Sequence, residues 1–96
     1  MKPSDALRIH GPAIRQIVAA HRAANARVFG SVLRGSDTSE SDLDLLIDPT
    51  TSMTLFDIGA IRHKLHLLLN VEVDVLTPAA LPDHYREKVI AEARPV

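Results

Sequence analysis

Apolar residues recur at helical spacing in some stretches of the chain and alternate with polar residues in others. The helical spacing predicts helices over residues 4–24, 54–69 and 82–93. The first of these contains Gly11-Pro12, which predicts either a turn before a helix that begins at Pro12 or a kink within one helix.

The alternating stretches predict short strands over residues 27–29, 42–47 and 71–76. Along the chain the order is helix, strand, strand, helix, strand, helix, without a repeat or a linker. We therefore expect a single domain over residues 1–96 of the α/β (α+β) class, in which a small mixed β-sheet packs against helices.

Particular residues predict the ends and the inner faces of the helices. Thr54 and Asp57 have the spacing of a capping box, and Asn25 and Asn70 are expected to end the first and second helices. The inner face of the second helix is expected to contain Leu55, Ile58, Ile61, Leu65 and Leu68. In the last helix, the side chains expected to point inward are those of Tyr85, Val89 and Ile90.

The composition narrows the classes of function. There is no cysteine, which excludes disulfides, thiolate nucleophiles and cysteine-rich zinc sites. The only aromatic residues are Phe29, Phe56 and Tyr85, too few for a stacking platform, and we expect no direct binding of nucleic acid. Neither a signal peptide nor a long apolar run is present, so we expect a cytoplasmic protein without membrane contact.

The net charge of −1 conceals a segregation of charge along the chain. Residues 1–34 contain six bases and one acid, whereas residues 35–61 contain six acids and no base. Such segregation suggests that the acidic middle meets a partner or a cation. Arg8, Arg15 and Arg22 recur every seven residues, and we interpret them as a solvated helix face in preference to a docking strip for a partner.

Two aspartates in the second predicted strand are candidates for catalysis. Asp42 and Asp44 are two residues apart, so both carboxylates should project from one face, while Leu43, Leu45 and Ile47 supply burial on the other. Adjacent carboxylates repel each other unless a cation neutralises them. Oxygen ligands without histidine or cysteine suit Mg²⁺, which completes its coordination with phosphate and water.

Asp74 lies in the third predicted strand and is a candidate for the same cluster. If the two strands are neighbours, Asp74 joins Asp42 and Asp44, and three carboxylates can hold two metal ions about 3.5–4 Å apart, the arrangement used in phosphoryl or nucleotidyl transfer. Glu72 competes with Asp74 for this role, because it lies two residues earlier and its side chain should project from the same face of the strand. His63 and His66 have a spacing that metals can use, but no third ligand accompanies them, so we do not expect zinc there.

Gly30-Ser31 follows the first predicted strand, where a glycine lets the backbone approach a phosphate closely. The exposed N–H groups and the hydroxyl of Ser31 could hold a triphosphate. Arg34 lies one turn later, where it could support the turn or contact phosphate, and Gly35 is expected to end the turn.

The sequence Gly30-Ser31, ten residues and then Asp42-Leu43-Asp44 resembles the signature of the DNA polymerase β-like nucleotidyltransferase superfamily. Residues 28–35 and 41–47 resemble its minimal nucleotidyltransferase (MNT) domains in particular, apart from Leu33, where alanine is usual. Asp74 matches the position of their third acidic residue. The likeness covers about residues 12–90.

This resemblance implies roles for the matched residues. Asp42 and Asp44 bind Mg²⁺, and together with Asp74 they position and activate an acceptor hydroxyl. Gly30 and Ser31 hold the β- and γ-phosphates of ATP. MNT domains of this size resemble the antitoxins of HEPN/MNT toxin–antitoxin pairs, which neutralise a HEPN-domain ribonuclease toxin by transferring AMP to one of its tyrosines.

The length of 96 residues bears on the acceptor. Larger members of the superfamily resemble this domain with a helical domain added over the acceptor, so we expect a protein acceptor here that brings its own surface. Two alternatives remain open: an antitoxin that acts by binding alone, and a nucleotidyltransferase that modifies a small molecule such as an aminoglycoside.

Overall fold

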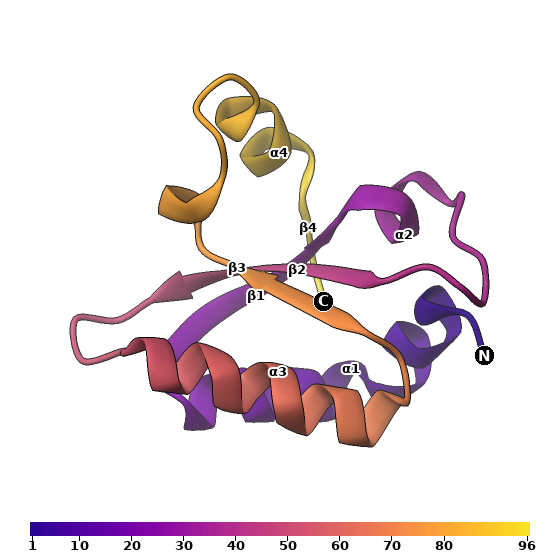
Figure 1. The fold of residues 1–96 in the computed structure, drawn as a ribbon, viewed down its shortest axis with the longest axis horizontal. Helices are drawn as coiled ribbons and strands as arrows, with labels where there is room; N and C mark the ends of the chain where they lie inside the picture. Colours follow the sequence, from indigo (N-terminus) through magenta and orange to yellow (C-terminus); the bar gives the residue numbers. More distant parts are fainter.

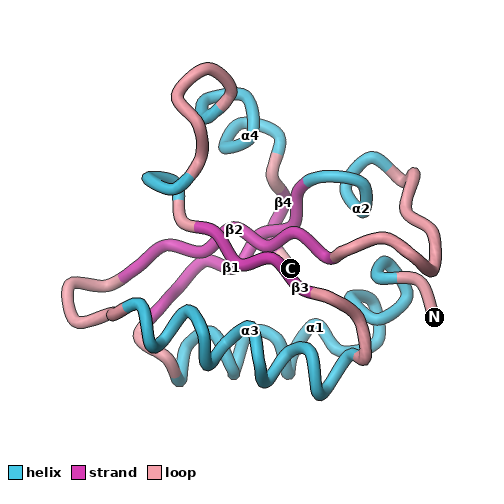
Figure 2. Tube along the Cα trace, viewed as in Figure 1, coloured by secondary structure: helices cyan, strands magenta, loops and turns pink.

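The computed structural model describes all residues, 1–96, as a four-stranded sheet with helices on both sides (Figures 1 and 2). The elements in chain order are α1 (Pro3–Ala20), β1 (Ala23–Phe29), α2 (Gly30–Arg34), β2 (Leu43–Pro49), α3 (Leu55–Leu69), β3 (Val73–Leu76), the 3-10 turn η1 (Pro78–Ala80), α4 (Arg86–Glu92) and β4 (Arg94–Pro95). The predicted order of helices and strands is thus confirmed, with the short helix α2, η1 and β4 as additions. No helix has the length and apolar character needed to cross a membrane.

The sheet is mixed, as the sequence predicts, and its strand order is β3-β2-β1-β4. β1 and β2 are antiparallel, whereas β2 and β3 are parallel and are joined through α3. β4 pairs with the outer edge of β1, where Arg27 lies opposite Pro95. A strand of two residues carries no alternating pattern, which is why the sequence does not predict it.

The hydrophobic core lies between one face of the sheet and the helices α1 and α3, which run side by side beneath it (Figure 1). Leu43, Leu45 and Ile47 of β2 are completely buried there, as the alternation predicts. Leu46 is also completely buried but does not belong to this cluster, because strand alternation turns it to the opposite face. The core therefore occupies one face of the sheet and leaves the other for a site.

The first helix is kinked where the sequence predicts an interruption. His10 has non-helical backbone angles, and Pro12 lies inside α1 just after it. The predicted end at residue 24 is wrong, because α1 stops at Ala20 and β1 already begins at Ala23. Asn25 is not a helix cap: with φ of 56° it lies in β1, where the pairing with β2 shifts register.

The capping box of α3 is confirmed, and in it the N–H of Thr54 donates to the Asp57 carboxylate at 2.9 Å. Asn70 ends the helix in the left-handed region, as predicted. The expected inner face is wrong at Leu55, which is 83% exposed, and at Leu68, which is also exposed. With about 3.6 residues per turn, Leu55 lies well off the face that the buried Ile61 defines.

The predicted helix over residues 82–93 is too long, because α4 begins only at Arg86. The Arg86 side chain donates to the carbonyls of Pro78 at 2.8 Å and Leu81 at 2.7 Å, which holds the preceding segment as a separate turn. Tyr85 and Ile90 are exposed, so the expectation that they point into the core is wrong. In Figures 1 and 2, α4 stands on the side of the sheet opposite α1 and α3.

Candidate active site

Residues from three strands form one row across the face of the sheet that the core leaves free. Phe29 in β1 is paired with Asp44 in β2, and Asp44 is paired with Asp74 in β3. The expectation that the second and third predicted strands are neighbours is therefore confirmed, and it places two acidic residues directly beside each other. Because the neighbours of Asp44 along the strand, Leu43 and Leu45, are fully buried, the strand holds its carboxylate firmly on this face.

The carboxyl group of Asp44 is in an unfavourable position for a negative charge. Its partial burial is the largest effect, and the nearby charges of Asp74 and then Asp42 add to it; together they raise the pKa of Asp44 to about 6. Arg34 opposes this shift. Such a carboxylate would be stabilised by a cation close to it.

Asp42 lies just outside the strand in which the sequence places it. β2 begins at Leu43, and Asp42 is the exposed last residue of the preceding loop. It is nevertheless near enough to Asp44 to influence its pKa. Glu72, the competitor of Asp74, has a different environment, because it lies before β3 and approaches His66 at 3.6 Å and Arg62 at 4.0 Å, both on α3.

The three aspartates do not form a ready-made metal site. No group of three or more His, Cys, Asp or Glu side chains is placed to hold a metal ion, and this includes His63 and His66. The donor chemistry nevertheless suits Mg²⁺, since one or two carboxylates with phosphate and water are its usual ligands. The paired Asp44 and Asp74, with Asp42 on the adjoining loop, fit that requirement.

Gly30 connects β1 to the short helix α2 and lies against the acidic pair. Its φ is 74°, and a Cβ atom at this position would overlap Oδ2 of Asp44 and lie 3.1 Å from its Cγ. Only glycine therefore fits between the turn and the carboxylate. Ser31 follows on the first turn of α2, and its carbonyl accepts a hydrogen bond from the N–H of Ser36 at 3.0 Å. Gly35 ends α2 in the left-handed region, as predicted.

The loop that carries Asp42 is attached to the N-terminal turn of α1. Asp37 is buried, and its carboxylate accepts a hydrogen bond from the backbone N–H of Ser4 at 2.9 Å. This bond is the main reason that the pKa of Asp37 is lowered. Sequence reasoning assigned Asp37 to the loop only, because the partner is 33 residues away and leaves no local signal.

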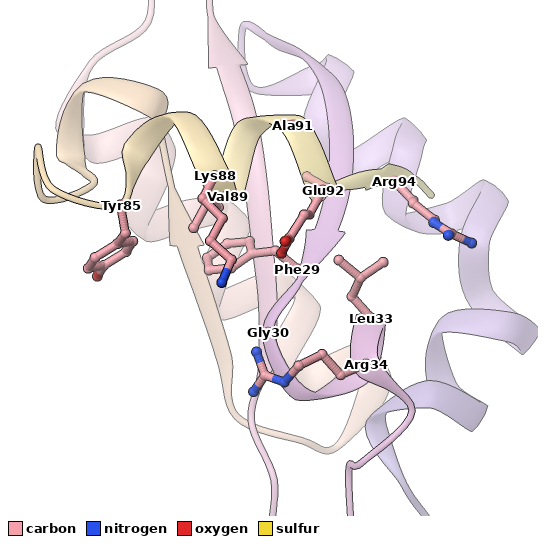
Figure 3. A pocket seen from close by; sticks show the side chains of 11 residues that line it. Phe29, Gly30, Leu33, Arg34, Tyr85, Lys88, Val89, Ala91, Glu92 and Arg94 are labelled. Atoms are coloured by element: carbon pink, nitrogen blue, oxygen red, sulfur yellow. The ribbon is translucent and has the colours of Figure 1, made fainter.

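A cavity of about 820 Å³ adjoins Gly30 on the same side of the sheet as Asp44. It lies between the end of β1, α2 and α4, and its lining is partly apolar, with Phe29, Leu33, Tyr85 and Val89. Figure 3 shows the side chains of Lys88 and Glu92 extending from α4 toward Phe29, and Arg34 extending past Gly30. This volume is in the range of sites for small molecules.

The cavity contains residues that sequence reasoning missed. From the sequence, Lys88 and Glu92 are placed only in the predicted helix over residues 82–93, and Phe29 only in a predicted strand and among the few aromatic residues, without a role at a site. Their short apolar runs look the same whether they face a core or a cavity.

Of the arginines predicted to form one solvated helix face, Arg8 and Arg15 lie on α1 and are exposed, as expected. Arg22 is also exposed but lies beyond the end of α1, with φ of 62°, so the prediction of one helix face is wrong there. Arg8 is near Asp5 at 3.6 Å, Arg15 donates to the carbonyl of Val96, and Arg22 is near Asp57.

Comparisons with known proteins agree with this geometry. Residues 12–96 match the nucleotidyltransferase domain family. Two proteins of Methanocaldococcus jannaschii assigned as protein adenylyltransferases are 30% and 31% identical to the chain; the first match covers 80% of this chain and 83% of the relative, and the second 75% and 74%.

Solved structures show the same fold. One assigned as a minimal nucleotidyltransferase has a TM-score of 0.87 and 39% identity, and the match covers 97% of this chain and 95% of that one. A toxin–antitoxin crystal structure with AMP-PNP has a TM-score of 0.73 at 16% identity and covers 88% and 69% of the two chains. The family match over most of the chain, with Asp44 and Asp74 paired beside Gly30, establishes that this protein belongs to the nucleotidyltransferase domain family.

Proposed function

We propose that this nucleotidyltransferase uses ATP and Mg²⁺ to transfer AMP to a tyrosine of a HEPN-domain ribonuclease toxin, and that this modification neutralises the toxin. The observation that carries the proposal is the pairing of Asp44 with Asp74 at the point where Gly30 touches the Asp44 carboxylate. Two carboxylates without an intervening base are costly unless a cation is bound between them and a phosphate chain.

The transfer breaks a phosphoanhydride bond of ATP and forms a phosphodiester bond to the tyrosine. The tyrosine oxygen bonds to the α-phosphorus of ATP while the bond from that phosphorus to the bridging oxygen of the β-phosphate breaks, and pyrophosphate leaves. The hydroxyl proton passes to a carboxylate, for which Asp74 is our candidate because it is exposed on the edge strand β3. Asp42, Asp44 and Asp74 would hold one or two Mg²⁺ ions, which neutralise the charge of the triphosphate.

The cavity beside Gly30 provides a place for the nucleotide. In our proposal the β- and γ-phosphates lie against Gly30 and Ser31, with Arg34 nearby as a counter-charge. The cavity then receives the nucleoside, and Phe29 and Tyr85 offer aromatic surface for a base. The volume of about 820 Å³ leaves room for it.

The exposure of Asp42 and Asp74, which with Asp44 form what we call the acidic corner, supports a protein acceptor. Asp74 lies on an edge strand and Asp42 on an exposed loop, so an acceptor can approach both from the solvent. The fold likeness to two toxin–antitoxin crystal structures supports a toxin as the acceptor. Assignment of the relatives as protein adenylyltransferases supports AMP as the transferred group.

The test is transfer of label from ATP labelled at the α-phosphate to the protein encoded by the neighbouring gene, with Mg²⁺ present. Label should appear on that protein, its mass should rise by one or more AMP units, and its ribonuclease activity should fall. Asp44→Asn and Asp74→Asn should both abolish labelling. Glu72→Gln is the matched control and should not, since Glu72 faces α3. Neutralisation without any gain in mass would contradict the proposal in favour of binding alone.

A further inference from the structure

The helix α3 has, on the side that faces away from the core, a row of three apolar residues and one histidine, all of them exposed or partly exposed. Phe56 is 90% exposed and Leu67 is 68% exposed, whereas Ile61 and Leu65 of the same helix are completely buried. Phe56, Ala60, His63 and Leu67 follow one another at spacings of four, three and four residues, so they form one row along the helix, which we call the outer stripe of α3.

The outer stripe has the pattern of a surface that packs against another helix. Positions i, i+4, i+7 and i+11 are those through which one helix contacts its neighbour. Large side chains lie at the two ends, and the small Ala60, beside Gly59, lies between them and leaves space for a side chain of the neighbouring helix. Such a row has no function in the fold itself, because α3 already contributes Ile61, Leu65 and Leu69 to the core.

The charges beside the stripe indicate what kind of helix fits. Arg62 and Lys64 are exposed, whereas Asp57, the only acidic residue of α3, is buried and near Arg22. Arg62 is 4.0 Å from Glu72, an exposed pair that contributes little, and Lys64 has no acidic partner. A second copy of this chain would bring the same two bases against them, which disfavours self-association through α3.

We propose that the outer stripe of α3 docks a helix of the partner protein that is apolar along the contact and acidic at its flanks. The proposal rests on the proposed function in taking this partner to be the protein that accepts AMP. The stripe and the paired Asp44 and Asp74 are on opposite sides of the sheet. Helix α3 covers one face (Figure 1), and Asp44 lies on the other face because its neighbours Leu43 and Leu45 belong to the core. Docking through α3 thus leaves the active site open.

The experiment measures binding of the neighbouring-gene product to the full chain, by titration and by size-exclusion chromatography with light scattering. Phe56→Glu and Leu67→Glu should each weaken the complex by at least tenfold, and Lys64→Glu should weaken it less. Ile9→Glu on α1 is the matched control, because Ile9 is also apolar and half-exposed but lies outside the stripe. All four variants should retain the melting temperature of the parent protein.

Unchanged binding of Phe56→Glu, or no complex with the parent protein, overturns the proposal. A dimer of the protein alone that Phe56→Glu dissociates overturns it as well, because the stripe then joins two copies. Label transfer, measured in parallel, separates this proposal from the previous one. If Phe56→Glu weakens binding but no label is transferred, only the proposed function is contradicted. If label is transferred but Phe56→Glu binds like the parent protein, only the docking surface is contradicted.

Discussion

Gly30 and the carboxylate of Asp44 lie in such close contact that a methyl group at position 30 would occupy the place of the Asp44 oxygen Oδ2. The glycine comes from the turn after β1 and the aspartate from β2, so the contact joins the two segments of the family signature in space. The ten residues between Ser31 and Asp42 form the rest of α2 and the loop that leads to β2.

We expect Gly30→Ala to disable the enzyme. Alanine at a φ of 74° costs about 1–2 kcal/mol, and its methyl group displaces the Asp44 side chain. A displacement of about 1 Å in a catalytic group lowers a rate roughly 100-fold. Steady-state kinetics of AMP transfer check this. Gly35→Ala is the control, since Gly35 has the same φ but no atom within 4 Å of the added methyl group, and it should lose stability without a comparable loss of rate.

Asp44→Asn should make the metal-free protein more stable while it abolishes transfer. The folded-state pKa of Asp44 is raised to about 6 from 3.8, so its charged form opposes folding at neutral pH, and this penalty disappears as the pH falls toward 4. The gain is about 1 kcal/mol after solvent screening, or roughly 4–8 °C in melting temperature. Melting curves recorded in EDTA at pH 7.5 and at pH 4 measure this gain. The melting temperature of the variant should be higher than that of the parent only at pH 7.5.

Magnesium offers a second readout on the same pair of proteins. If Asp44 helps to hold the ion, Mg²⁺ should raise the melting temperature of the parent at pH 7.5, because binding to the folded state stabilises it. The Asp44→Asn variant should respond less. An equal response of both proteins would contradict the role of Asp44 as a ligand.

Asp57→Asn should destabilise the protein at neutral pH but not in strong acid. The pKa of Asp57 is lowered, first by the N–H of Thr54 and further by Arg22, so its charged form favours folding. This contribution is complete above about pH 4 and is lost as the pH falls through the lower folded-state value. Melting curves should be recorded from pH 7 to pH 2. The parent should have the higher melting temperature at pH 7, and the melting temperatures of the two proteins should become equal toward pH 2. Asp5→Asn, which removes an exposed carboxylate on α1, should melt like the parent throughout.

Lys88→Gln should raise the KM for ATP. Lys88 lines the cavity and extends toward Phe29 in Figure 3, where its charge can meet a bound nucleotide. An ion pair at such an exposed site contributes about 1 kcal/mol, which corresponds to a roughly fivefold change. Glu87→Gln, an exposed neighbour outside the cavity, should leave the KM unchanged. If the two variants have the same KM, the nucleotide does not use this cavity.

The parts of the fold that follow from local pattern could be predicted from the sequence. Leu43, Leu45 and Ile47 recur at a spacing of two on either side of Asp44 and Leu46, which identifies both the strand and the face that carries Asp44. The capping box of Thr54 and Asp57 marks the start of α3 because both partners lie within one helical turn. The positions of Gly30 and Asp44 were likewise predictable from their spacing.

Features that depend on distant partners could not be predicted in this way. The end of α1 lies in a run rich in alanine, which does not show where the helix stops. The strand β4 forms only because β1 has a free edge with which it can pair. The cavity requires α4 to stand across from α2, and no local pattern in α4 distinguishes a cavity wall from a core face. The exposure of Leu55 has a similar reason, because the face of α3 that is buried depends on how the helix packs against the sheet.

The hydrogen bond between Asp37 and Ser4 couples the start of the chain to its chemistry. Ser4 lies in the first turn of α1, and Asp37 is five residues before Asp42 on the same loop. Displacing the first turn of α1 therefore pulls directly on the segment that carries Asp42, our candidate metal ligand, although some forty residues separate the two in sequence. The first turn of α1 thus fixes the loop before β2, and the position of Asp42 relative to Asp44 depends on how well ordered that turn is.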